Sequence, residues 1–332
     1  MDKIQFGAWQ AINTCLAVQP FERVVIVADG ETDTITQSLC AMARAITPHI
    51  TYFLMEDFGK RPFPMPTAIR QALLNADVSM YTGTYVEGEL PLFRQHIYDI
   101  VAQGHLRHAG MPWLTATIME QGMNADYEQI KVLCEKVIAI VTPARHVHVT
   151  TALGTDLDVR IGKWKWDICD GHITPGRWSN LPDGEVYTSP ESVSGVAIID
   201  GVLGDYFDKK YGDLSSNPVR VEIRDGHAVP GTVTCSNAAL ENEFDRYIFR
   251  PNTPNCNRVG EFAIGTNIFL TEIIGNLLQD EKFPGVHIAF GDCYQSTTGC
   301  PLVCDYHIDG VIRKPTVVVD GRTIMVDGTF QF

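Results

Sequence analysis

The spacing of apolar residues changes near residue 145, and this change restricts the fold of the chain more than any other feature. Before it, short strand-like runs alternate with helical patterns, which is the order that an open α/β sheet requires. We expect strands over 23–29, 51–55 and 78–84, and helices over 67–76, 92–102 and 126–140.

After residue 145, alternating strands joined by tight turns replace the strand and helix alternation. Three segments have the pattern of β-hairpins with a turn at a glycine, namely 146–162, 219–234 and 316–328. One helical insertion is expected over 267–278. The fold class is therefore α/β, with an open α/β domain over 1–145 followed by a β-rich (α+β) domain over 146–332.

Composition excludes several classes of function. The formal net charge is −14 and the isoelectric point is near 5.1, whereas nucleic-acid binders need clustered Lys and Arg, so no nucleic-acid partner is expected. No apolar run approaches a membrane span, and the first residues lack the pattern of a signal peptide, so we expect a cytoplasmic protein with no membrane partner. The nine cysteines lack CxxC spacing, which favours reduced thiols.

The turn after the first expected strand argues against a nucleotide site. It reads ADGETDT and contains neither GxGxxG nor GxxxxGK[ST]. The first domain is therefore interpreted as a scaffold.

His307 and Asp309 lie two residues apart in DYHIDGVI. In an extended strand, residues i and i+2 project from the same face, so both side chains can reach one metal ion. The motif is weak by itself, because a hydrogen-bonded pair on a surface strand has the same spacing.

His287 lies inside the apolar run VHIAF, and Tyr294 follows the Gly-Asp turn beyond it. A buried imidazole needs a partner, which is either a metal ion or a backbone carbonyl. A tyrosine beside a metal can donate to a developing oxyanion, although an aromatic packing role is an equal alternative.

Glu185 and Glu261 each follow a glycine and begin an apolar strand-like run. An unpaired carboxylate in such a setting is costly, so each is either a metal ligand or part of an ion pair with Arg177 or Arg258. Together with the two histidines and Asp309, they form a set of carboxylate and imidazole ligands that suits zinc, cobalt, manganese or ferrous iron. Such a set can bind two cations bridged by carboxylate and water.

These residues lie in five motifs that occur in a fixed order: GTDL at 154–157, NLPDGEVYTSP at 180–190, GEFAIGTN at 260–267, DEKFPGVHIAFGDCY at 280–294 and YHIDGVI at 306–312. In these motifs the chain resembles the dinuclear metallopeptidases of the aminopeptidase T and aminopeptidase S type. The resemblance covers most of the second half of the chain.

The resemblance implies a hydrolase of aminopeptidase type, in which a metal-activated water attacks an N-terminal peptide or small amide bond. It implies two divalent ions (zinc, cobalt or manganese) bound by Glu185, Glu261, His287, His307 and Asp309, with Tyr294 in the active site. A glutamate would move the proton, and the choice between Glu185 and Glu261 stays open. The family also implies a homodimer and a peptide or small-molecule substrate.

A related branch of similar length holds the main alternative, a ring-cleaving 2,5-dihydroxypyridine 5,6-dioxygenase with a single Fe(II). His287, His307 and Asp309 match the two-histidine, one-carboxylate set that such an enzyme needs. That branch has a histidine at the position of Glu261 and an apolar residue at that of Glu185. The two additional carboxylates of this chain favour a second cation and therefore hydrolysis. A binding protein without turnover is a further alternative.

Two other groups of residues have side chains that could bind a metal ion or orient its ligands. His146 and His148 alternate in an expected strand and are interpreted as an exposed strand face. Asp280 and Glu281 precede His287 and are either carboxylates that orient the imidazoles or part of a solvated turn.

Overall fold

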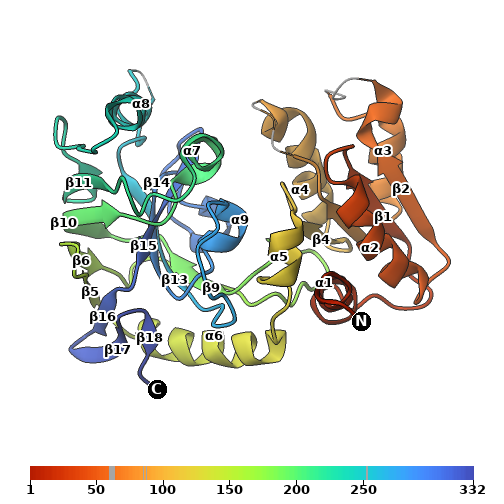
Figure 1. Ribbon diagram of the computed structural model, residues 1–332, viewed down its shortest axis with the longest axis horizontal. Coiled ribbons are helices and arrows are strands. Elements are labelled where there is room, and N and C mark those ends of the chain that lie inside the picture. Colours follow the sequence, from red (N-terminus) through yellow and green to blue (C-terminus); the bar gives the residue numbers. More distant parts are fainter. Residues whose placement is uncertain (60–63, 85, 87, 252) are drawn as a thin grey trace. The chain divides into compact units, whose positions relative to one another are not determined.

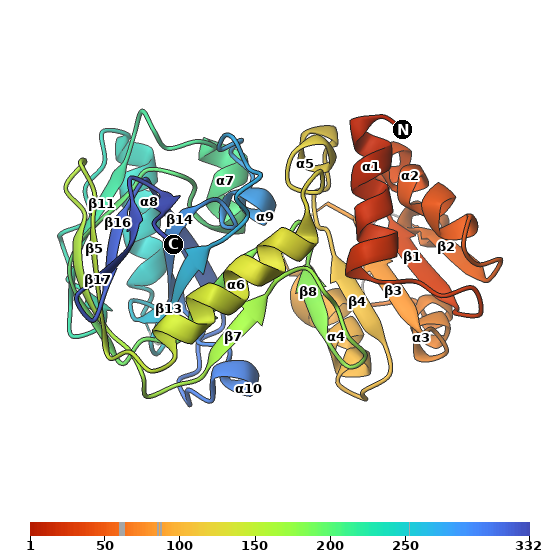
Figure 2. The same ribbon diagram turned by 90° about the horizontal axis from the view of Figure 1, so that it is seen from below.

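The computed structural model describes residues 1–59, 64–84, 86, 88–251 and 253–332. The chain forms two compact units, and Figures 1 and 2 show the elements of each. The first unit comprises residues 1–131 and 170–183, and the second comprises residues 132–169 and 184–332.

The first unit contains a five-stranded parallel sheet in the order β2-β1-β3-β4-β8. All five residues of β1 are buried, as expected for a parallel strand covered on both faces. Val25 and Val27 of β1 belong to an apolar core with Ile69 of α3 and Ile97 of α4. The strands are β1 (Val24–Ala28), β2 (Ile50–Leu54), β3 (Val78–Tyr81), β4 (Arg107–Gly110) and β8 (Trp178–Asn180).

The helices of the first unit connect and cover these strands. They are α1 (Lys3–Trp9), α2 (Asp33–Arg44), α3 (Thr67–Leu74), α4 (Gln95–Val101) and α5 (Ala116–Glu120), with π-helical segments at Gln10–Cys15 and Leu90–Arg94 and a 3₁₀ turn at Met55–Phe58. Helix α6 (Tyr127–Val141) begins in this unit and continues into the second. The strands and helices expected in the first half of the sequence are confirmed.

The second unit contains two antiparallel sheets. The larger has the order β12-β11-β10-β6-β5-β16-β17-β18, and the smaller has the order β15-β14-β13-β9-β7. The larger sheet is built from β5 (His146–Thr150), β6 (Asp156–Arg160), β10 (Ser192–Ile199), β11 (Val219–Arg224), β12 (His227–Ala228), β16 (Thr316–Val319), β17 (Arg322–Val326) and β18 (Thr329–Phe330). The smaller sheet is built from β7 (Trp166–Cys169), β9 (Glu185–Thr188), β13 (Val259–Gly265), β14 (Gly285–Gly291) and β15 (His307–Arg313).

The three hairpins expected from the sequence are confirmed as the antiparallel pairs β5–β6, β11–β12 and β16–β17. The two sheets meet where β10 and the segment after it contact β15. The Gly201 N–H donates to the Val311 carbonyl, and a Cβ at Gly310 would lie only 2.5 Å from the Ile199 side chain. Glycine at position 310 therefore permits the close approach of the two sheets.

The prediction of a helix over 267–278 is wrong. Only α9 (Leu277–Asp280) is helical there, and the preceding residues form turns. The Asp280 carboxylate accepts hydrogen bonds from the N–H groups of Ile274, Gly275 and Asn276, so a side chain binds the donors that a helix would use. The other helices of this unit are α7 (Gly204–Tyr211), α8 (Ala238–Ile248) and α10 (Gln295–Thr298).

The division of the chain differs from the single boundary expected at residue 145. The contacts divide it within α6, after Lys131, and residues 170–183 return to the first unit. The return occurs because Trp178–Asn180 forms β8 and pairs with β4 as the edge strand of the parallel sheet. Among the helices that the structure describes, none is long and apolar enough to cross a membrane.

Candidate metal centre

One face of the smaller sheet of the second unit carries the five residues predicted as ligands. Cross-strand partners share a face, and residues i and i+2 of a strand also share one. By this rule the register of β9, β13, β14 and β15 places on a single face Glu185, Glu261, His287, His307 and Asp309.

Most register partners of these residues are small, although His287 also lies opposite Val311 of β15. Glu185 lies opposite Gly265, His287 opposite Ala263, and both Glu261 and Asp309 opposite Ala289. Alternate positions of β13 and β14 carry Phe262, Ile264, Ile288 and Phe290, which belong to the apolar core. The sheet thus has an apolar face and a face where small residues leave room for charged ones.

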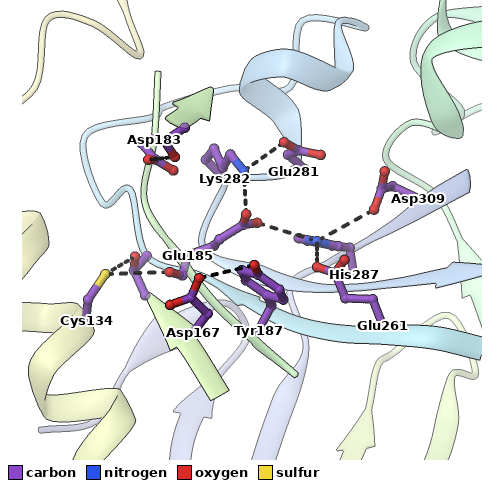
Figure 3. A network of polar contacts seen from close by, with 12 residues as sticks. Cys134, Asp167, Asp183, Glu185, Tyr187, Glu261, Glu281, Lys282, His287 and Asp309 are labelled. Atoms are coloured by element: carbon purple, nitrogen blue, oxygen red, sulfur yellow. Dashed lines mark hydrogen bonds and ion pairs between the residues drawn. The ribbon is translucent and has the colours of Figure 1, made fainter. Parts of the chain in front are cut away.

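His287 contacts three carboxylates (Figure 3). Its Nε2 lies 3.3 Å from Glu261 Oε1, 3.5 Å from Glu185 Oε2 and 3.8 Å from Asp309 Oδ1. Atoms that bind one ion at about 2.0–2.2 Å lie roughly 3–3.5 Å from each other, so most of these separations suit ligands of a shared cation.

His307 lies beside the same carboxylates. Its Nε2 is 3.1 Å from Glu261 Oε2 and 3.1 Å from Asp309 Oδ1. Its Nδ1 lies 3.0 Å from the Asp292 carbonyl oxygen, which can only accept a hydrogen bond. This contact fixes the proton on Nδ1 in the neutral ring and leaves the Nε2 lone pair for a metal ion.

Glu261 connects the two histidines, because its Oε1 faces His287 and its Oε2 faces His307. Among the described residues, no hydrogen-bond donor reaches Glu185 Oε2 or Glu261 Oε2 with good geometry, and both atoms are buried. A buried carboxylate oxygen without a donor is costly, and a bound cation would satisfy it. The donor set therefore fits divalent metal ions.

The carboxylates create a strongly negative environment. Burial lowers the pKa of His287, but Glu261, Glu185 and Asp309 outweigh it and raise that pKa to about 9. Burial likewise opposes protonation of His307, and Asp309 and Glu261 raise its pKa well above the ordinary value. Burial raises the pKa of Glu261, whereas His287 and His307 lower it to about 2. The field that attracts protons here also attracts metal cations.

Tyr294 lies against His307, with ring centroids 4.6 Å apart, and has Tyr187 on another side at 5.7 Å. Its backbone is left-handed, with φ 51° and ψ 57°, a conformation that costs an aromatic residue about 1–3 kcal/mol. Burial, then Glu261 and Asp309, raise the pKa of Tyr294 well above its ordinary value, so its hydroxyl stays protonated. The structure therefore brings Tyr294 to the predicted ligands with a proton to donate.

Two residues of the centre were missed or left open by sequence reasoning. Glu281 has a carboxylate oxygen within 4.8 Å of ligand atoms of His287 and Asp309. Lys282 is 3% exposed at its side chain and pairs with both Glu281 and Glu185. The signal in the sequence is the tripeptide DEK at 280–282, two residues before a strand whose only ionisable side chain is His287, since charged residues are rarely buried without partners.

The remaining candidates lie elsewhere. The Asp280 carboxylate holds the loop before α9 by binding its N–H groups, and no contact with an imidazole is found for it among the described residues. His146 and His148 pair with Asp158 and Asp156 at 2.8 Å, with side chains 45% and 42% exposed. Their interpretation as an exposed strand face is confirmed.

The family model of the thermophilic metalloproteases (M29) matches residues 114–302, more than half of the chain. The chain belongs to this family. The match includes Glu185, Glu261, His287 and Tyr294, whereas His307 and Asp309 follow its end. Membership of M29 makes the protein a metal-dependent hydrolase by family.

Two solved structures share the fold of this M29 member over nearly its whole length. The 2,5-dihydroxypyridine dioxygenase from Pseudomonas putida KT2440 has a TM-score of 0.72 and 15% identity, covering 100% of this chain and 98% of that one. Wild-type AmpT from Thermus thermophilus has a TM-score of 0.70 and 16% identity, covering 99% of each chain. No curated protein matches the chain. At these identities the structures show a shared α/β fold.

Proposed function

We propose that this M29 member is a hydrolase of aminopeptidase type that uses two divalent ions to cleave an N-terminal peptide or small amide bond. The observation that carries the proposal is the orientation of Glu261, whose two oxygens face two different imidazoles. A carboxylate in this position can bridge two ions, an arrangement that many aminopeptidases use.

The ligands divide into two sets that share Glu261. Glu185, Glu261 and His287 form one set, here named the Glu185 half-site. Glu261, His307 and Asp309 form the other, the Asp309 half-site. Within each set the ligand atoms lie within 4.8 Å of one another, which supports one ion in each half-site.

Divalent ions, when bound, lower the pKa of coordinated water and polarise a carbonyl group. The protein residues supply orientation and proton transfer. The Asp292 carbonyl holds the His307 ring, and Tyr294 has a protonated hydroxyl that suits donation to the oxyanion of a tetrahedral intermediate. Both oxygens of Glu261 face imidazoles. Glu185 has one oxygen on Lys282 and the other on the His287 imidazole, whereas Glu281 pairs with Lys282 through one oxygen. Glu281 is therefore the carboxylate that we assign to proton transfer.

A second candidate function has a specific observation in its favour. His287 and His307 both approach Asp309 Oδ1, at 3.8 Å and 3.1 Å, and these three residues form a two-histidine, one-carboxylate set. Such a set binds Fe(II) in non-haem oxygenases, and the fold is shared with a 2,5-dihydroxypyridine dioxygenase. Glu185 and Glu261 in the same cluster favour the two-ion hydrolase.

Activity assays on one preparation separate the two functions. Metal-free protein is reconstituted with zinc, cobalt, manganese or, without oxygen, ferrous iron, and each form receives a library of aminoacyl amides and, separately, 2,5-dihydroxypyridine. We expect amide hydrolysis with zinc, cobalt or manganese and no oxygen uptake. Oxygen uptake with the pyridine in the iron form alone, without amide hydrolysis in any form, would replace the proposal with the dioxygenase.

A further inference from the structure

Lys282 is buried, and Figure 3 shows its side chain between Glu185 and Glu281. Its Nζ lies 2.6 Å from Glu185 Oε1 and 2.7 Å from Glu281 Oε1. Burial of an ammonium group is costly unless carboxylates compensate it, and two do so here. The charge of Lys282 is therefore a fixed part of the centre.

The backbone holds Lys282 in this position. The Asp208 carboxylate accepts a hydrogen bond from the Leu277 N–H at the start of α9, and the Lys282 carbonyl accepts one from the Asn267 N–H. Gly265, the register partner of Glu185, has no side chain to exclude this segment, since a Cβ there would lie 2.1 Å from the Phe283 carbonyl oxygen. The fold thus places the lysine directly beside Glu185.

Because of this contact, the two oxygens of Glu185 have different partners. Oε1 accepts a hydrogen bond from the Lys282 ammonium group. Oε2 is buried, lacks a hydrogen-bond donor among the described residues and faces His287 Nε2 at 3.5 Å. Glu185 accordingly has one oxygen for a cation, and a positive charge lies beside that half-site.

The two half-sites also differ in the orientation of their histidines. His307 Nδ1 contacts the Asp292 carbonyl, a partner that orients the ring and raises its basicity. His287 Nδ1 is buried without a hydrogen-bond partner in the described part of the chain. Both differences favour cation binding at the Asp309 half-site.

We propose that the two half-sites bind divalent cations with unequal affinity and that Lys282 is a positioning residue that weakens cation binding at the Glu185 half-site. The Asp309 half-site takes the first cation, and the Glu185 half-site takes the second and exchanges it readily. This inference rests on the two-ion centre proposed above, but not on the bond that the enzyme cleaves.

Titration of the metal-free, full-length protein with Co²⁺ tests the proposal, followed by visible absorption and calorimetry. For the wild type we expect two binding events that differ in affinity by about tenfold or more, since an oriented imidazole alone changes metal affinity by about 10–100-fold. Lys282→Met removes a like charge from the weaker half-site, so the weaker event should tighten about tenfold while the stronger stays within about threefold. Lys210→Met is the matched control, because it removes the same charge from a pair with Glu243, and it should change neither event.

Circular dichroism and thermal melting show whether Lys282→Met folds. Two further variants assign each binding event to a half-site and keep the test decisive if it does not. Glu185→Gln should lose the weaker event alone, and Asp309→Asn should lose the stronger. Loss of the stronger event in Glu185→Gln, or an unchanged or weakened second event in Lys282→Met, overturns the proposal. Two equal events in the wild type overturn the inequality alone, whereas a single event contradicts the two-ion centre itself.

Discussion

Strands β1 and β13 are both completely buried, yet they are built differently. Strand β1 reads VVIVA and has apolar side chains on both faces. Strand β13 reads VGEFAIG, with Phe262 on the apolar face and Glu261, only 3% exposed, on the other. Burial of Phe262 stabilises the fold, whereas burial of Glu261 opposes it unless cations compensate the charge. The difference indicates that β1 serves stability and that one face of β13 serves chemistry.

The largest expected effect on activity is that of a substitution at Glu261. In Glu261→Gln the carboxylate that joins the two half-sites loses its charge, so we expect amide hydrolysis to fall at least about a thousandfold, since even one lost oxyanion donor costs about 10²–10³. Bound metal per chain should fall in parallel. Steady-state kinetics and elemental analysis measure the two quantities. Near wild-type activity would show that Glu261, like the residues of β1, has no role in catalysis.

The adjacent residue should behave in the opposite way. Phe262 is fully buried and its ring contacts Trp166 edge-on, so Phe262→Ala should lower the free energy of unfolding by about 3–5 kcal/mol. Urea unfolding of the metal-free protein measures this, and the kcat of the fraction that stays folded should change little. Glu261→Gln serves as the control, because the metal-free form should lose far less stability. Equal losses of stability would remove the distinction between the two faces.

A substitution at Tyr294 tests whether a residue that is not a predicted metal ligand contributes to catalysis. Tyr294→Phe keeps the ring against His307 and removes the hydroxyl, so kcat should fall by about 10²–10³ with the metal content unchanged. Tyr211→Phe is the matched control, because its hydroxyl binds Glu243 outside the centre. If both variants hydrolyse amides at the wild-type rate, Tyr294 is a packing residue.

The stability of the metal-free protein should depend on pH through His287. Burial opposes the charge of this imidazole, but three carboxylates raise its pKa to about 9, above about 6.5 in the unfolded chain. The stabilisation is complete below about pH 6.5 and is lost as the pH rises through about 9. Urea midpoints of the metal-free protein should therefore decrease across this range. Metal-loaded protein should not show this decrease, because cation binding requires the deprotonated imidazole. A flat profile without metal would contradict the electrostatic account of this face.

The smallest effect is expected on the exposed sheet face. His148 pairs with Asp156 in solvent, so His148→Ala should change the free energy of unfolding by no more than about 0.5 kcal/mol and leave activity unchanged. Thermal melting and the amide assay measure these. A clear loss of activity would show that this exposed sheet face contributes to catalysis or substrate binding.

Features with a local signal could be predicted from the sequence. His307 and Asp309 share a face because residues i and i+2 of any strand do, and the three hairpins have glycine turns. Lys282 could not be assigned in this way, because its contact with Glu185 depends on strand register and on the absence of a side chain at Gly265. The turns at 267–276 were mistaken for a helix because their N–H groups bind Asp280, which local periodicity does not show. The return of β8 to the first sheet likewise depends on a pairing between distant segments.

The central claim is that Glu261 joins two cation sites on one face of a buried sheet. Elemental mass spectrometry of protein purified without oxygen and without chelators tests it most directly by counting divalent ions per chain. The account predicts about two ions per wild-type chain, as expected for a carboxylate-bridged pair. About one iron per chain, lost on exposure to air, would contradict it and favour the mononuclear oxygenase.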